Sequence, residues 1–179
     1  MRKYLVLAAL GIAAVVGVLA WPLVSQVGHG SGPRVSISNV AALPSPLPYP
    51  YAEGADAKAA VADAFARAKT SGKRVLIDFG GNWCPDCRIL AGVMALPEMK
   101  SFIAAHYETV TVDVGRFDKN LDIVKSFGVE KLKGVPTVII AEPDGKPINV
   151  TNSSELSDAR SMSPQALANW LAKWTAPVS

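Results

Sequence analysis

The sequence has few residues of the kinds that bind transition metals, and it carries little net charge. Its 179 residues include two cysteines and two histidines, and charged residues make up 18% of the chain. The net charge of +3 comes without the clustered basic stripe that displaces counterions from phosphates, so we expect no nucleic-acid binding. A zinc site needs four ligands, and His29 and His106 each stand alone, so we expect no resident metal.

What the chain does have is a long apolar run at its start. Arg2 and Lys3 precede residues 5–24, which contain no charged side chain. A cleaved signal peptide and a membrane anchor both fit a short basic start followed by an apolar helix. We therefore assign residues 1–24 to one or the other and expect export. A buried core helix would explain the terminal charges poorly.

Residues 25–54 have the composition of a linker. They are rich in proline and glycine and show little hydrophobic periodicity. Such a composition favours an extended spacer. We expect this linker to precede a folded domain over residues 55–179.

From residue 55 onward, the pattern alternates between helix and strand. Apolar spacing predicts helices over residues 55–73, 85–96, 98–106, 120–129 and 163–174, and strands over residues 74–81, 107–115, 136–142 and 147–150. Asp56 and Ser163 are expected N-caps, Gly72 ends the first helix, and Pro97 breaks or kinks the second. Helical crossovers imply parallel strands, and the turn at Asp144 implies an antiparallel hairpin. We therefore expect an α/β fold with a mixed sheet between helices.

The two cysteines, Cys84 and Cys87, stand where a predicted strand gives way to a predicted helix. Free N–H groups of the first helical turn favour a thiolate at Cys84, and a thiolate is the attacking species in disulfide exchange. Cys87, one turn further on, should be less exposed and should resolve the mixed disulfide. A structural bridge across so short a loop would add little stability. A transient copper site made by two thiolates stays open.

The surroundings of these cysteines resemble the thioredoxin family. Residues 83–87, WCPDC, correspond to the family's Trp-Cys-x-x-Cys active site, and residues 75–79 to the strand before it. Residues 134–137, GVPT, correspond to the cis-proline loop that faces the cysteines. The resemblance covers about residues 55–174. It implies a thioredoxin-like three-layer α/β/α fold, and the WCPDC version resembles a bacterial envelope subgroup.

The resemblance also implies roles for individual residues. Asp78 falls where thioredoxins keep a buried acid that takes the proton of the resolving cysteine, and desolvation in its apolar strand should raise its pKa. The alternative is an acid that caps the next turn. A substrate surface would be formed by Trp83, Pro85, Asp86, Val135 and Pro136. Val135 would present its backbone groups beside a cis Pro136, unless that proline is trans at the start of an edge strand.

Three features depart from the family pattern. Gly80 stands where the family commonly has tryptophan, so we expect that side of the site to be barer. Thr111 stands where many thioredoxins place a lysine, so Asp78 would lack a cationic partner. Residues 114–133 exceed the minimal loop, and they are either a partner contact or surface elaboration.

The residues between the cysteines suggest the direction of the reaction. A carboxylate at Asp86 disfavours a nearby thiolate, and a less stable thiolate makes the protein more reducing. We therefore expect a periplasmic reductase of disulfide-containing protein substrates, either soluble or anchored to the inner membrane through residues 5–24. The redox-active disulfide Cys84–Cys87 would serve without a further cofactor, and a membrane thiol-reductant donor would supply electrons. The alternatives are a disulfide oxidase or isomerase, and a non-catalytic binding or copper-handling module.

Overall fold

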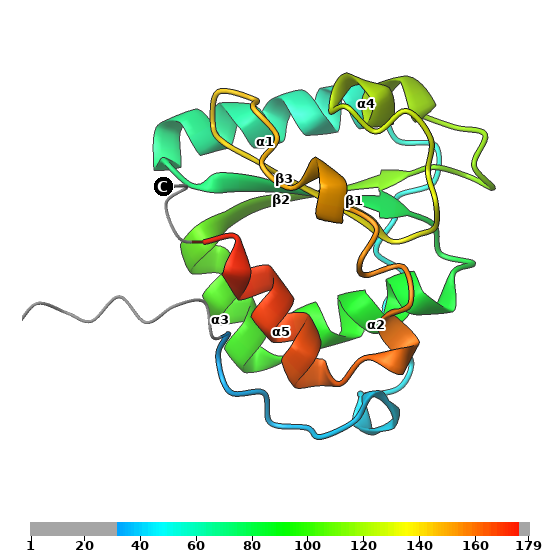
Figure 1. Cartoon of the computed structure of the whole chain (residues 1–179), viewed down its shortest axis with the longest axis vertical. Helices are drawn as coiled ribbons and strands as arrows, with labels where there is room; N and C mark the ends of the chain where they lie inside the picture. Colours follow the sequence, from blue (N-terminus) through cyan, green and yellow to red (C-terminus); the bar gives the residue numbers. More distant parts are fainter. Residues whose placement is uncertain (1–31, 176–179) are drawn as a thin grey trace, which may run out of the picture.

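Three strands form a sheet between two layers of helices in the computed structural model, which describes residues 32–175 (Figure 1). The signal peptide or anchor expected over residues 1–24 lies outside the described residues. Within the described part of the chain, no helix is long and apolar enough to cross a membrane.

The helices begin and end close to where the sequence predicts. They are α1 (Ala57–Ser71), α2 (Pro85–Met94), α3 (Pro97–His106), α4 (Leu121–Ser126) and α5 (Pro164–Lys173), with short 3-10 turns η1 (Val40–Ala42), η2 (Val150–Asn152) and η3 (Ala159–Ser161). The Asp56 carboxylate accepts a hydrogen bond from the N–H of Ala59 at 3.0 Å, and Gly72 ends α1 with φ of 72°. Pro97 occupies the first turn of α3 and separates it from α2, because proline is tolerated there and not in a helix interior.

The central strand is β1 (Arg74–Gly80). It runs parallel to β2 (Tyr107–Asp113) and antiparallel to β3 (Thr137–Ala141), so the sheet is mixed, as expected. Helices α1 and α4 cover one face, and α2, α3 and α5 cover the other (Figure 1). Burial on both faces explains why β1 reads as a nearly continuous apolar run.

The prediction of a fourth strand over residues 147–150 is wrong. Pro147 makes one isolated bridge to the end of β3. Beyond it the buried side chain of Asn149 bonds to β3, accepting from the N–H of Ile140 at 2.8 Å and donating to the carbonyl of Val138 at 2.8 Å. A side-chain amide therefore supplies the partners that the backbone of a further strand would have given.

Residues 32–54 lie against the domain and are not a free linker. Side chains of α5 and α3 bind the backbone of residues 32–36, and Leu43 is buried in the core between the sheet and these helices. The guanidinium of Arg88 in α2 donates to the carbonyls of Leu47 and Pro48 at 2.9 and 3.2 Å. The segment passes along the helical layer of α5 and α2 (Figure 1) and delivers residues 47–52 to the edge of the sheet.

Candidate active site

The two cysteines lie at the start of α2, directly after the loop that follows β1. Cys84 is the N-cap, and its Sγ accepts a hydrogen bond from the N–H of Cys87 at 3.2 Å. The same sulfur lies 3.3 Å from the carbonyl oxygen of Val135, to which its S–H can donate. The Val135–Pro136 peptide bond is cis, and Pro136 is buried beside this contact. The fold therefore brings the WCPDC and GVPT motifs together.

Cys84 is less accessible than the sequence led us to expect. Cys84 is 3% exposed and Cys87 is 0% exposed. Cys87 is therefore the less exposed of the two, as expected, but the difference is small. Pro85 and Trp83, on either side of Cys84, are exposed. A substrate would therefore have to contact the exposed side chains of Trp83 and Pro85 in order to reach the Cys84 sulfur.

The two thiols differ clearly in acidity. Hydrogen bonding from Cys87, through its side chain and its backbone N–H, lowers the pKa of Cys84 to about 7, against the opposing effects of burial and of Asp86. The bond to Cys84 together with burial raises the pKa of Cys87, and the nearby charge of Asp78 adds to the effect. At neutral pH the proton therefore stays on Cys87, whereas about half of Cys84 is present as the thiolate. This difference supports Cys84 as the attacking sulfur.

Asp78 lies on β1 and is 2% exposed. Burial raises the pKa of Asp78 to about 7, and a hydrogen bond from the Tyr51 hydroxyl to its Oδ1 at 2.9 Å partly offsets that effect. A carboxyl group that titrates near neutrality can accept a proton and release it again. Its charge influences Cys87, the thiol that must lose a proton to resolve a mixed disulfide.

Tyr51 is a site residue that the sequence reasoning missed. A Cβ on Gly80 would lie 2.3 Å from the Tyr51 hydroxyl and 2.7 Å from the Cys87 sulfur, so both groups occupy the space above this glycine. The side of the site that we expected to be barer is therefore filled by Tyr51. The glycine was itself a signal, because a missing side chain in a packed interior leaves room that another group must fill.

Arg160 is a second residue that sequence reasoning missed. Its backbone N–H donates to Oδ1 of Asp86 at 2.9 Å, and its Nε lies 3.0 Å from both carboxylate oxygens. Burial opposes ionisation of Asp86, but these bonds hold its pKa below the usual value. Asp86 is 4% exposed, so it lies inside the protein and is not part of the substrate surface that we expected.

An aromatic patch lies next to the cysteine motif. Trp83 is 39% exposed, and its Nε1 donates to the carbonyl of Gly115 at 2.7 Å. Phe117, 40% exposed, packs edge-on against Trp83 with ring centroids 6.0 Å apart, and the Arg116 guanidinium lies over the indole. Part of the long 114–133 segment therefore extends the surface beside Trp83.

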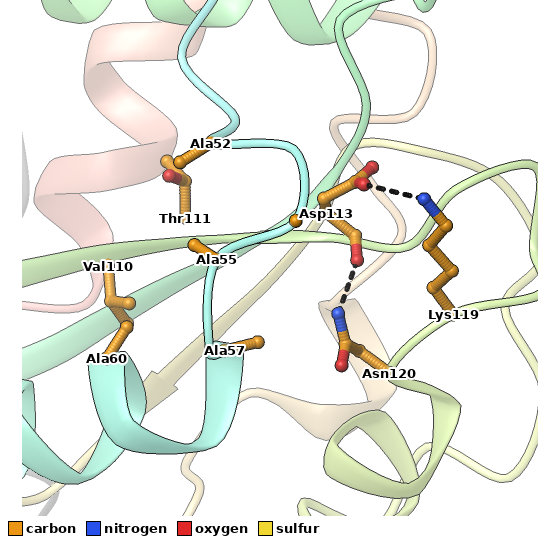
Figure 2. A pocket seen from close by; sticks show the side chains of 10 residues that line it. Ala52, Ala55, Ala57, Ala60, Val110, Thr111, Asp113, Lys119 and Asn120 are labelled. Carbon is orange, nitrogen blue, oxygen red and sulfur yellow. Dashed lines mark hydrogen bonds and ion pairs between the residues drawn. The ribbon is translucent and has the colours of Figure 1, made fainter.

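A pocket of about 560 Å³ lies along the outer edge of β2 (Figure 2). Four alanines form much of its wall, and Asp113 is held there by Lys119 at 3.7 Å and by the side chain of Asn120. Neither cysteine lines it. In the part of the chain that the structure describes, no group of three or more histidine, cysteine, aspartate or glutamate side chains could hold a metal ion.

Comparison with known proteins agrees with this geometry. A family model described as thioredoxin-like matches residues 56–143. Thioredoxin of Alicyclobacillus acidocaldarius is 33% identical over 84 residues, which cover 47% of this chain and 71% of that protein. The chain belongs to the thioredoxin family.

Two further relatives support membership of the thioredoxin family. Thioredoxin H4 of Arabidopsis thaliana is 35% identical over 66 residues, 37% of this chain and 51% of that protein. The crystal structure of a disulphide isomerase from Xylella fastidiosa Temecula1 aligns with a TM-score of 0.69 at 40% identity, covering 73% of this chain and 99% of that one. The protein is thus a thioredoxin-like disulfide oxidoreductase with the neighbouring pair Cys84 and Cys87.

Proposed function

We propose that this thioredoxin-like protein reduces protein disulfides in the bacterial periplasm. The observation that carries the proposal is the unequal pair at the start of α2. Cys84 has a pKa of about 7, whereas Cys87 keeps its proton and lies within the influence of Asp78. A nucleophile, a resolving thiol and a base are the three groups that reduction of a disulfide requires.

The first step is attack by the Cys84 thiolate on one sulfur of the target disulfide. A bond forms between Cys84 and that sulfur, the target S–S bond breaks, and the second target sulfur leaves as a thiolate that takes up a proton. The N–H groups at the start of α2 stabilise the thiolate before attack. The exposed groups around Cys84, including Trp83 and Pro85, would receive the target backbone.

The second step releases the reduced target. Cys87 gives its proton to the Asp78 carboxylate, and the Cys87 thiolate attacks Cys84. The Cys84–Cys87 disulfide forms while the target sulfur leaves as a thiolate, so two electrons have passed to the target. A dithiol donor must then reduce Cys84–Cys87 again. Because the chain starts with a basic and then apolar segment typical of export, we propose a membrane thiol-reductant donor.

The acidity of Cys84 supports reduction over oxidation. Thioredoxins, which reduce, have an attacking cysteine with a pKa near 7, whereas that of a strong disulfide oxidant is near 3.5. Cys84, at about 7, is close to the first value. Asp86 still raises the pKa of Cys84, but its ion pair with Arg160 opposes that effect, so Asp86 favours reduction less than we expected.

Isomerisation is the second candidate. The relative from Xylella fastidiosa is described as a disulphide isomerase, and this chain covers 99% of it at 40% identity. An isomerase uses the same attack by Cys84, but the substrate's own thiol, rather than Cys87, resolves the mixed disulfide. The role of Cys87 therefore separates the two candidates.

Two assays in parallel test the proposal. One measures reduction of insulin disulfides with dithiothreitol as donor, and the other measures recovery of activity from ribonuclease with scrambled disulfides. A reductase should lose insulin reduction in both Cys84→Ser and Cys87→Ser. Retained recovery of ribonuclease activity in Cys87→Ser, together with poor insulin reduction by the unmodified protein, would favour the isomerase.

A further inference from the structure

We propose that Tyr51 is a positioning residue of this active site: its hydroxyl holds the Asp78 carboxylate ready to accept the proton of Cys87. The proposal rests on the proposed role of Asp78 in resolving the mixed disulfide. It goes further because it adds residues 47–52 to the active site. These residues precede the region matched by the family model.

The segment is fixed at several points around Tyr51. The side chain of Asn82, in the loop before Cys84, accepts from the N–H of Tyr51 at 3.1 Å and donates to its carbonyl at 2.8 Å. The hydroxyl of Thr111 on β2 donates to the carbonyl of Pro50 at 2.9 Å. Because the side chains of Asn82 and Thr111 bind the backbone of Tyr51 and Pro50, this part of the segment is held beside the site.

The Tyr51 hydroxyl lies beside both groups that exchange the proton. It donates to Oδ1 of Asp78 at 2.9 Å, and the Cys87 thiol is close enough to raise the pKa of Tyr51. Tyr51 is 2% exposed, so no bulk water shares this contact. The hydroxyl and the Cys87 sulfur both lie against Gly80, at 2.3 and 2.7 Å from the position that a Cβ would take.

Asp78 has a small set of neighbours that can change its charge. Tyr51 faces it from the N-terminal segment, and Cys84 and Cys87 face it from α2. Thr111 pairs with it across the sheet and is neutral. Among the described residues, the hydrogen bonds and ion pairs of Asp78 include no lysine or arginine, so the hydroxyl of Tyr51 is the group that stabilises its ionised form.

The chemical consequence follows from this arrangement. Asp78 can accept a proton only when it is ionised, and burial opposes ionisation. A hydrogen bond donated to the carboxylate favours the ionised form, so Tyr51 increases the fraction of Asp78 that is able to act near neutral pH. Thr111 binds this segment through its hydroxyl, and Gly80, which has no side chain, leaves room for Tyr51.

The test compares Tyr51→Phe, which keeps the ring and removes the hydroxyl, with the unmodified protein. The reduced protein is mixed with 5,5′-dithiobis(2-nitrobenzoate), which leaves nitrothiobenzoate on Cys84, and release of this group by Cys87 is followed at a series of pH values. Tyr51→Phe should shift the midpoint of the release rate upward by about one pH unit, a tenfold change in the acidity of Asp78. Carbon NMR of the labelled Asp78 carboxyl should show the same shift.

Tyr107→Phe is the matched control. Tyr107 is also buried, and its hydroxyl donates to the carbonyl of Leu171 at 2.6 Å, in the core between the sheet and α5. This variant loses a buried hydroxyl of the same kind but should leave the release profile unchanged. An unshifted Asp78 midpoint in Tyr51→Phe, or an equal shift in Tyr107→Phe, would overturn the proposal.

A third variant separates the role of Asp78 from the role of Tyr51. Asp78→Asn should slow release of nitrothiobenzoate at neutral pH and abolish the dependence on Tyr51. Unchanged release in Asp78→Asn would sink the proposed role of the acid, whereas slow release in Asp78→Asn with no shift in Tyr51→Phe would sink only the role of the tyrosine. If Tyr51→Phe does not fold, Thr111→Val, which frees the Pro50 carbonyl, should give a smaller shift in the same direction, and no shift would count against the proposal.

Discussion

Asp86 and Arg160 form an ion pair across 74 positions of sequence, and this pair fixes the first turn of α2 to η3. Asp86 is buried, so its negative charge acts on the Cys84 thiolate unless the guanidinium neutralises it. Arg160 therefore influences the acidity of Cys84 through its ion pair with Asp86.

Arg160→Gln should raise the pKa of Cys84 above about 7, because a carboxylate without its partner disfavours the neighbouring thiolate. The pH dependence of alkylation of Cys84 by iodoacetamide measures the change. Removing the carboxylate as well, in Arg160→Gln/Asp86→Asn, should return the midpoint to about the original value or below it. A midpoint that does not move in Arg160→Gln would show that Asp86 does not influence Cys84.

The reduced protein should have one reactive thiol and one unreactive thiol. Alkylation of Cys84 should reach half its maximal rate near pH 7, where its thiolate is half formed. Cys87, whose pKa is raised, should react much more slowly over the same range. Mass spectrometry of partly alkylated protein assigns each site, and equal, slow modification of both sulfurs would contradict the assigned order.

Asp78→Asn should stabilise the protein at high pH and not at low pH. Asp78 titrates at about 7 in the folded protein, against an ordinary value of 3.8. Between these values the folded state holds a proton that the unfolded state has lost, so the free energy of unfolding falls as pH rises from about 4 to about 7. At 1.36 kcal/mol per pKa unit, the variant should gain up to about 4 kcal/mol above pH 7.

Denaturation by urea at about pH 4 and about pH 8 measures that gain. Asp144→Asn makes the same chemical change in an exposed turn, so it tests whether the effect needs the buried position. A gain at about pH 8 that is no larger than the gain at about pH 4 would mean that burial does not disfavour the Asp78 charge.

Gly80→Ala should destabilise the protein by about 1–3 kcal/mol, because its Cβ would overlap the Tyr51 hydroxyl and the Cys87 sulfur. Gly92→Ala is the matched control. In α2 the new methyl group would meet only the ends of the Leu47 and Leu43 side chains, at 3.1 and 3.2 Å, which can turn aside. Thermal unfolding of both variants checks the difference, and an equally small effect in Gly80→Ala would mean that Tyr51 is not tightly placed.

Much of the fold follows from local patterns in the sequence. The helices and the three strands were predictable because apolar spacing, caps such as Asp56 and Ser163, and the break at Pro97 act over short distances. The missing fourth strand was not predictable in this way. Residues 147–150 have strand-like composition, but the side chain of Asn149 competes for the edge of β3, and composition does not reveal that contact.

The site residues that belong to short sequence motifs were predictable. Cys84, Cys87 and Asp78 are positioned by the strand, loop and helix that follow one another in the sequence, and Pro136 was found through its own GVPT motif before β3. Tyr51 and Arg160 reach the site from 27 and 74 positions away. A proline-rich segment has no periodicity to show which face is buried, so the packing of residues 32–54 depends on tertiary contacts that only the folded chain defines.

The reduction potential of the Cys84–Cys87 pair tests the assignment as a reductase most directly. Equilibrating the protein with mixtures of reduced and oxidised dithiothreitol or glutathione, and counting free thiols by mass, gives the value. We predict a potential near that of thioredoxin, about −270 mV. A potential near −120 mV, where strong disulfide oxidants lie, would contradict the account and reverse the direction of electron flow.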